Sequence, residues 1–176
     1  CAERGAEVTL VSGPVNLKVT HPNIHRIDVE SAEQMYNAAV SAYTEADAGI
    51  LCAAVADFTP ETVAGQKIKR EKDDLVLRLK PTHDIAAALG KQKQAHQKLV
   101  GFALETTDEV AHAQDKLNRK NFDFIVLNSL NDKGAGFRCD TNKITIIDRQ
   151  GTTPYPLKGK KEVADDIIDR LVDLFS

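Results

Sequence analysis

Apolar runs of strand length alternate with amphipathic stretches along most of this chain. The runs are bounded by turn residues and begin near Val8, Arg26, Ala48, Asp74, Leu99, Phe124 and Ile144. Helical patterns lie between most of them, at residues 31–44, 107–121 and 161–175. The first begins with a serine of the type that caps helices, and the last places four residues on one stripe: Val163, Ile167, Leu171 and Leu174. This order predicts a single α/β domain over residues 1–176, with a mainly parallel sheet covered by helices on both faces.

Two runs look apolar on both faces, GILCAAVA at residues 49–56 and FIVLN at residues 124–128. Cys52 is therefore expected inside a buried strand. The runs that begin at Asp74 and Ile144 alternate in polarity or lie close to turn signals. We interpret them as hairpin-like or edge additions to the sheet.

The first five residues, CAERG, read as the last turn of a helix that Gly5 closes. A strand pattern follows directly, so we expect a first βα unit of the fold to be missing before Cys1. A short frayed terminus is the alternative interpretation.

The charge balance narrows the class of partner. Lys and Arg number 23 against 26 Asp and Glu, and no long block of one sign marks a nucleic-acid arm or a polybasic anchor. No apolar run approaches the ~20 residues of a membrane span. The three cysteines and five histidines lack metal-ligand spacing. This composition favours a cytoplasmic protein that binds neither nucleic acid nor membrane.

Ligands of open α/β sheets bind at the carboxyl ends of the strands, and this rule selects a few segments. They are residues 12–14, 53–57, 102–106 and Asn128. No GxSxG, Walker or GxGxxG motif occurs, which argues against a serine hydrolase and a P-loop enzyme.

The alanines before Asp57 have small side chains, so a flat ligand could lie against the backbone at this strand end while Asp57 offers a carboxylate. A tight helix–sheet contact with Asp57 as a helix cap explains the pattern equally well. Lys67 lies ten positions further on (67 minus 57), beyond a loop that contains Pro60 and Gly65. Such a loop could cover the Asp57 end, although exposed lysines such as Lys67 and Lys69 usually have no ligand.

Lys116 and Lys120 are four apart in a predicted helix and therefore share one face. On spacing alone a solvated face is the better explanation, and a polyphosphate bound between them is the other. Phe102 follows a glycine near a strand end, where it is either part of the core or a partner for a ring.

Seven segments together resemble one family. They are VTLVSGPVNL, CAAVADF, KIK, HDIAAAL, LVGFALET, KLNRKNFDFIVLN and GFRCDTN. In this order they are similar to phosphopantothenate–cysteine ligase, the synthetase half of the bacterial bifunctional coenzyme A biosynthesis flavoprotein. The resemblance implies a Rossmann-like fold, a homodimer, and fusion to a flavin-dependent decarboxylase. It also implies that CTP and Mg²⁺ or Mn²⁺ serve to join 4′-phosphopantothenate and cysteine through an acyl-cytidylate.

The resemblance implies site residues by position. Nucleotide contacts would come from Ala53, Ala54, Asp57, Lys67, His83, Asp84, Ile85, Ala86, Phe102, Lys116 and Lys120. Lys67 would be catalytic because it faces the triphosphate, and the acyl substrate would contact Ala54 and Asn128. The ligands of the metal are not indicated.

The chain departs from the family pattern in two places. Thr82, His83 and Asp84 replace the frequent Asn-Pro-Asp, and the front segment with a Gly-rich turn, an Arg and an Asn is absent before Cys1. We expect these residues alone to bind CTP weakly and to make no product. Two other functions stay open, a non-catalytic nucleotide-binding Rossmann domain and an NAD-dependent oxidoreductase, and the missing glycine fingerprint disfavours the second.

Overall fold

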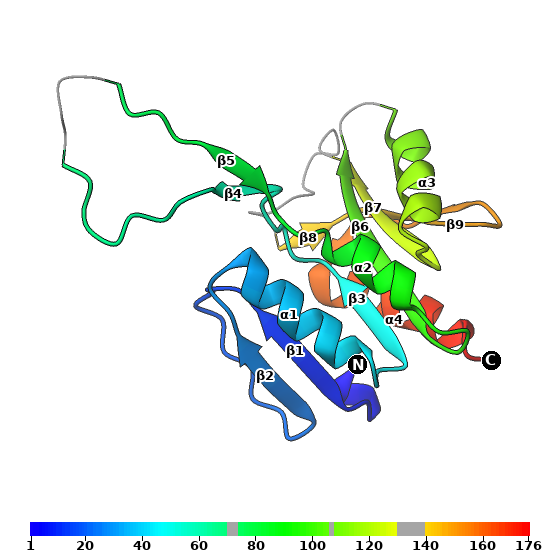
Figure 1. The fold of residues 1–176 in the computed structure, drawn as a ribbon. Coiled ribbons are helices and arrows are strands. Elements are labelled where there is room, and N and C mark those ends of the chain that lie inside the picture. The colour runs from blue at the N-terminus through cyan, green and yellow to red at the C-terminus, as the bar shows by residue number, and fades with distance from the viewer. Residues whose placement is uncertain (70–73, 106–107, 130–139) are drawn as a thin grey trace.

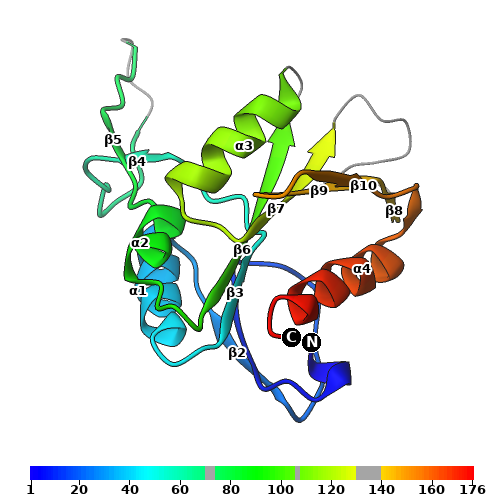
Figure 2. The same cartoon turned by 90° about the vertical axis from the view of Figure 1, so that its right-hand side faces the viewer.

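A five-stranded sheet forms the centre of the protein in a computed structural model, which describes residues 1–69, 74–105, 108–129 and 140–176. The strand order is β10 (Thr152–Pro154), β9 (Ile144–Asp148), β7 (Phe124–Ser129), β6 (Lys98–Glu105) and β3 (Ala48–Leu51). Figures 1 and 2 show α1, α2 and α3 on one face of this sheet and α4 on the other. The predicted three-layer, Rossmann-like α/β architecture is confirmed.

The parallel part of the sheet consists of β3, β6 and β7, and the antiparallel strands β9 and β10 are added beyond β7. The run that begins at Ile144 is therefore a hairpin-like addition, as its pattern predicted. Its strand, β9, pairs on both sides and leaves β10 at the edge.

A second parallel pair is formed by β1 (Val8–Ser12) and β2 (Ile24–Asp28), and α1 lies over it (Figure 1). Before β1, a short 3₁₀ helix (Ala2–Arg4) ends at Gly5, whose φ of 90° is left-handed. This confirms the helix end that the sequence predicted. Arg4 forms ion pairs with Asp165 and Asp169 on α4.

Three of the four α-helices begin within two residues of a predicted helical pattern, and α2 was not among those patterns. α1 (Ala32–Tyr43) starts with a capping box between Ser31 and Gln34, and α2 (Ile85–Gln92) is capped by the Asp84 carboxylate. α3 (Glu109–Arg119) and α4 (Lys160–Asp173) lie within the predicted helical patterns or begin one residue before them.

Two hydrophobic clusters lie on opposite faces of the sheet. Leu99, Ile125 and Leu127 pack against α1, α2 and α3, with Tyr43 and Leu117 among the buried residues. On the other face, side chains of β6, β7 and β9 pack against the α4 stripe of Val163, Ile167 and Leu171. None of the helices in the described part of the chain has the length and apolar content needed to cross a membrane.

One strand is shorter than its apolar run predicted. β3 ends at Leu51, and its side chains are half-buried rather than buried. Cys52 lies beyond the ladder and is exposed, so its predicted burial is wrong. Among the described residues β3 pairs with β6 alone, and the alanines that follow have too little side-chain surface to be held by packing.

Residues 58–69 and 74–81 leave the body of the protein as a long arm (Figure 1). At its base, β4 (Phe58–Pro60) pairs with β5 (Leu79–Pro81) in antiparallel register. The run that begins at Asp74 thus contributes two residues of β5, Leu79 and Lys80, to the hairpin-like addition that its pattern predicted. A further short antiparallel pair joins β8 (Thr141–Asn142) to β11 (Lys158–Gly159).

Candidate functional site

The carboxyl ends of β3, β6 and β7 meet at one edge of the sheet because these strands are parallel. The segment that follows β3 crosses from this edge to the turn before α2. Thr82 holds it there: the Thr82 N–H donates to the Asp57 carbonyl at 2.9 Å, and the Thr82 hydroxyl donates to the Ala56 carbonyl at 2.7 Å. The predicted residues 53–57 and 83–86 are thus brought together. Ala53, Ala54 and Asp57 are exposed there.

Asp84 joins this turn to α3. One carboxylate oxygen, Oδ1, accepts the Ala87 N–H at 2.9 Å and caps α2, while Oδ2 accepts from the Lys120 ammonium. Burial alone would raise the pKa of Asp84. The hydrogen bonds from Lys120 and Ala87 and the positive charges of Lys120 and Arg119 instead hold that pKa below its ordinary value, so Asp84 is ionised at neutral pH.

The C-terminal ends of α2 and α3 touch at a seam that fixes Lys120. A Cβ atom at Gly90 would lie 2.0 Å from the Lys120 carbonyl oxygen, so only glycine permits this approach. The Asn121 side chain donates to the Gly90 carbonyl at 3.0 Å. The Lys120 side chain therefore starts beside Gly90, and its ammonium reaches Asp84 at the N-terminal end of α2.

Lys116 lies one turn earlier on α3, and its ammonium donates to the Phe102 carbonyl at 2.8 Å. Both predicted lysines therefore have partners within the protein, which excludes the purely solvated face. Phe102 lies inside β6 rather than at its end, and its half-buried ring packs against the cluster beneath α4.

Asn128 is one residue from the end of β7, in register with Leu104 of β6. Its side-chain oxygen accepts from the Asn142 amide at 2.8 Å. Asn142 closes the GFRCDTN segment, so the resemblance contained this residue although it was not predicted to be a site residue. Residues 130–139, which include most of that segment and Cys139, lie outside the described residues.

Two further residues were missed by sequence reasoning. Thr82 ties the two segments together, and only its place before His83 could have indicated it. Tyr36, on α1, lies against the exposed His83 with ring centroids 4.7 Å apart. The sequence carried no signal for this contact, because 47 positions (83 minus 36) separate the rings.

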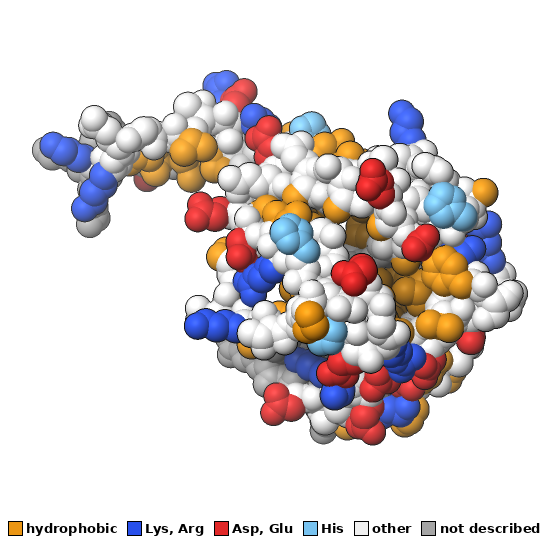
Figure 3. All heavy atoms as spheres, turned by 90° about the horizontal axis from the view of Figure 1, so that it is seen from below, with side chains coloured by type: hydrophobic (Ala, Val, Ile, Leu, Met, Phe, Trp, Pro, Cys, Tyr) orange, Lys and Arg blue, Asp and Glu red, His pale blue; other side chains and the backbone are white. Residues whose placement is uncertain are grey.

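Lys67 is the predicted residue that the structure does not bring to the site. It is exposed on the arm, which Figure 1 shows standing away from the strand ends of its own chain. The cover that Pro60 and Gly65 were expected to form is therefore open. Figure 3 shows hydrophobic side chains exposed along this arm. They include Phe58, Val63, Ile68, Leu75, Val76, Leu77 and Leu79.

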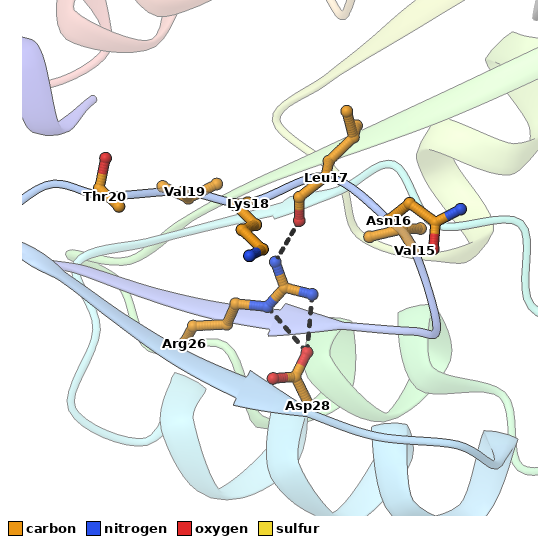
Figure 4. Close-up of a pocket in the computed structure, with 8 residues that line it drawn as sticks. All are labelled: Val15, Asn16, Leu17, Lys18, Val19, Thr20, Arg26 and Asp28. Atoms are coloured by element: carbon orange, nitrogen blue, oxygen red, sulfur yellow. Dashed lines mark hydrogen bonds and ion pairs between the residues drawn. The ribbon is translucent and has the colours of Figure 1, made fainter.

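A groove of about 580 Å³ lies apart from these residues, between the loop after β1 and the strand β2 (Figure 4). It is lined by Val15, Asn16, Leu17, Lys18, Val19, Thr20, Arg26 and Asp28. The Arg26 guanidinium donates to Asp28 and to the Leu17 carbonyl, each at 2.7 Å. This cation therefore holds the loop closed, and the groove contains no predicted site residue.

No cluster of three or more His, Cys, Asp or Glu side chains suited to a metal ion occurs among the described residues.

Comparison with known proteins gives a consistent family. Residues 1–174 match the family model described as the DNA/pantothenate metabolism flavoprotein C-terminal domain. A prokaryotic protein named cysteine/cysteine sulfinic acid decarboxylase is 56% identical over 98% of this chain and 48% of its own length. The coenzyme A biosynthesis bifunctional protein CoaBC of Bacillus subtilis is 43% identical over 97% of this chain and 42% of its own length.

A solved structure extends the match. The crystal structure of the C-terminal domain of CoaBC is 37% identical, with a TM-score of 0.79 over 97% of this chain and 75% of that one. This chain spans about half the length of the curated relatives it matches. It belongs to the DNA/pantothenate metabolism flavoprotein C-terminal domain family and has the fold of the CoaBC C-terminal domain.

Proposed function

We propose that the protein is a CTP-dependent phosphopantothenate–cysteine ligase of coenzyme A biosynthesis. The observation that carries the proposal is the family match over residues 1–174, together with the identity to CoaBC proteins. The site supports it, because Thr82 ties Asp57 to the turn that contains Asp84, and Asp84 binds Lys120, beside the edge where α/β folds bind ligands.

The reaction has two steps. A carboxylate oxygen of 4′-phosphopantothenate attacks the α-phosphorus of CTP, the bond to the β-phosphate oxygen breaks, and pyrophosphate leaves. The cysteine amine then attacks the acyl carbon, the bond to the CMP oxygen breaks, and the amine loses a proton as the amide forms. Activation comes first because an ionised carboxylate is a poor electrophile.

The residues divide these tasks. Exposed Ala53 and Ala54 leave backbone open to a flat ligand, and Asp57 offers a carboxylate to the cytidine. Backbone N–H groups of residues 83–86 at the start of α2, including those of Ile85 and Ala86, suit phosphate oxygens. Lys116 and Lys120 would neutralise the triphosphate, and Asn128 with Ala54 would contact the acyl substrate. The half-buried ring of Phe102 would offer only its exposed edge to the nucleotide.

Mg²⁺ or Mn²⁺ would arrive with the triphosphate and neutralise charge during transfer of the nucleotidyl group. Asp57 is the exposed carboxylate nearest in sequence to Ala53 and Ala54, and it could supply one metal ligand. The chain itself contributes the orientation of the phosphates.

Lys67 can act at the site only if the arm moves or if a second copy of the protein supplies this lysine. We place this lysine near the triphosphate of the assembled enzyme, reached either by closure of the arm or from a second copy in a homodimer. The hydrophobic side chains exposed along the arm support association, because so much apolar surface is costly in water. Mixing inactive Lys67→Gln and Asp57→Asn proteins distinguishes the two, since activity returns only if each copy completes the other's site.

The relatives' name, bifunctional protein CoaBC, supports a further partner, a flavin-dependent decarboxylase domain in the same polypeptide. We infer a cytoplasmic location from the free thiols of Cys1 and Cys52, which suit a reducing compartment.

The test is release of CMP and pyrophosphate by the purified full-length enzyme that carries this domain. We expect CMP to form only when CTP, phosphopantothenate and cysteine are all present, and ATP to replace CTP poorly. Nucleotide binding without release would support a regulatory domain instead, and hydride transfer to NAD would support an oxidoreductase. Carbon dioxide release from cysteine alone would give this chain the activity named for its 56% identical relative.

A further inference from the structure

We propose that Asp84 competes with the phosphates of the nucleotide for Lys120, and that this competition sets how tightly the triphosphate binds. The inference rests on the proposed function, because it requires a phosphate near Lys120. It assigns Asp84 a positioning role that acts through the lysine.

The geometry of the pair supports competition. The Lys120 side chain is 11% exposed, and its ammonium donates to Asp84 Oδ2, whereas the Asp84 side chain is 52% exposed. A cation with so little water around it depends on its carboxylate partner. A phosphate oxygen that took the place of this carboxylate would meet the same need.

Asp84 can lose Lys120 without moving. Its other oxygen, Oδ1, accepts the Ala87 N–H at 2.9 Å, so the carboxylate is held by the first turn of α2. The lysine has a flexible four-carbon stem, and its ammonium can swing between two acceptors. The seam at Gly90 fixes only the backbone end of this stem.

The surrounding charges make the exchange reversible. Arg119 is the other cation that acts on Asp84, and its guanidinium pairs with Asp115 at 3.2 Å. When pyrophosphate leaves, Asp84 recovers Lys120, and CMP retains fewer phosphate contacts. The pair therefore lowers affinity for the triphosphate in return for faster release of products.

The test is Asp84→Asn, which removes the charge but keeps a side-chain oxygen that caps helices equally well. We expect CTP and inorganic pyrophosphate to bind about two- to fivefold more tightly, the range that a partly exposed ion pair supports. CMP should change less, and CTP affinity should fall more steeply with salt. If Asp84 only held the turn in place, Asp84→Asn would leave CTP binding unchanged, because asparagine keeps the cap.

Asp115→Asn is the matched control, since it removes a nearby carboxylate from α3 that pairs with Arg119 and not with Lys120. We expect it to leave CTP affinity almost unchanged. In a Lys120→Ala background, Asp84→Asn should have no effect on CTP binding. Asp84→Ser, which also caps helices, replaces Asp84→Asn if circular dichroism shows that the first variant is misfolded.

The outcomes separate the two proposals. If CTP does not bind the parent protein, or if Lys120→Ala leaves its affinity unchanged, the proposed nucleotide site is wrong. If CTP binds and Lys120→Ala weakens it, but Asp84→Asn fails to tighten it, then competition by Asp84 is wrong while the proposed function stands.

Discussion

At the scale of single residues, the cations of this site already have partners within the protein. Lys116 donates to a backbone carbonyl and Lys120 to a carboxylate, so a ligand must offer a better acceptor than either. For Lys116, phosphate oxygens are better acceptors because they carry the negative charge that a backbone carbonyl lacks, whereas at Lys120 they must compete with the Asp84 carboxylate.

Lys116→Ala and Lys120→Ala should each weaken CTP more than CMP, because the expected partners are phosphates that CMP lacks. The difference should shrink at high salt, which screens these contacts. Calorimetric titration of both nucleotides measures it, with Lys161→Ala on the distant helix α4 as the control. Equal losses for CTP and CMP would put the two lysines away from the outer phosphates.

In the full-length enzyme, Lys67→Gln should lower turnover about 10²- to 10³-fold if this lysine faces the transferring group, by analogy with loss of one preorganised stabilising donor. Thermal stability should not change, because Lys67 is exposed on the arm. Lys69→Gln is the matched control on the same segment. A loss below about tenfold in turnover would make Lys67 an ordinary surface lysine.

At the scale of elements, the α2–α3 seam joins the fold to the site. Gly90→Ala should destabilise the protein by about 1–3 kcal/mol, because the new methyl group meets a backbone carbonyl that cannot turn away. This cost exceeds the gain in helix propensity, about 1 kcal/mol. Urea denaturation measures it, and Gly65→Ala is the control because its Cβ would meet nothing within 4 Å. An unchanged midpoint for Gly90→Ala would mean that the seam is loose.

The turn between β9 and β10 is tied to α4 through Asp148. Burial would raise the pKa of Asp148, but the bonds from Arg170 at 2.8 Å and from the Gln150 and Gly151 N–H groups lower it below 3.8. A lowered folded-state pKa means that this stabilisation is complete above the unfolded-state pKa, near 4, and is lost as the pH falls through the folded value.

Asp148→Ala should therefore cost about 1–3 kcal/mol at pH 7, because the N–H donors and Arg170 lose their acceptor. The cost should decline below about pH 4. Denaturation at a series of pH values tests this, with exposed Asp173→Ala as the control. A cost independent of pH down to 2 would assign the loss to packing rather than to charge.

At the scale of the whole molecule, the arm is the feature that a single chain leaves unexplained. Val63 is 82% exposed and Val76 81% exposed, with other apolar side chains beside them. If they pack in a homodimer, Val63→Ser with Val76→Ser should raise the dimer dissociation constant by at least tenfold, since each buried valine contributes about 1.5–3 kcal/mol. Sedimentation equilibrium measures it, with exposed Val172→Ser as the control. A monomeric parent protein at high concentration would contradict the dimer.

Sequence reasoning predicted the α/β architecture and three of its helices, but it failed where contacts join residues far apart in the sequence. Caps and apolar stripes are local signals, so α1, α3 and α4 were predicted near their observed ends. The alanines after Leu51 resemble a strand locally, but a strand needs a partner, and in the part of the chain that the structure describes β3 is paired on its β6 side alone. Likewise, the contact between Asp84 and Lys120 joins positions 36 apart, which no periodicity reveals.

The exposed thiol of Cys52 offers a way to watch the site directly. Cys52 lies directly before Ala53 and Ala54, where a bound nucleotide would cover its thiol. Alkylation by a water-soluble maleimide should therefore slow when CTP is added, whereas Cys1, also exposed, provides an internal reference within each digested sample. Read by mass spectrometry, the ratio of the two labelled peptides would report occupancy of the site without any turnover. This chemical footprinting experiment is possible because β3 ends at Leu51 and leaves the Cys52 thiol exposed.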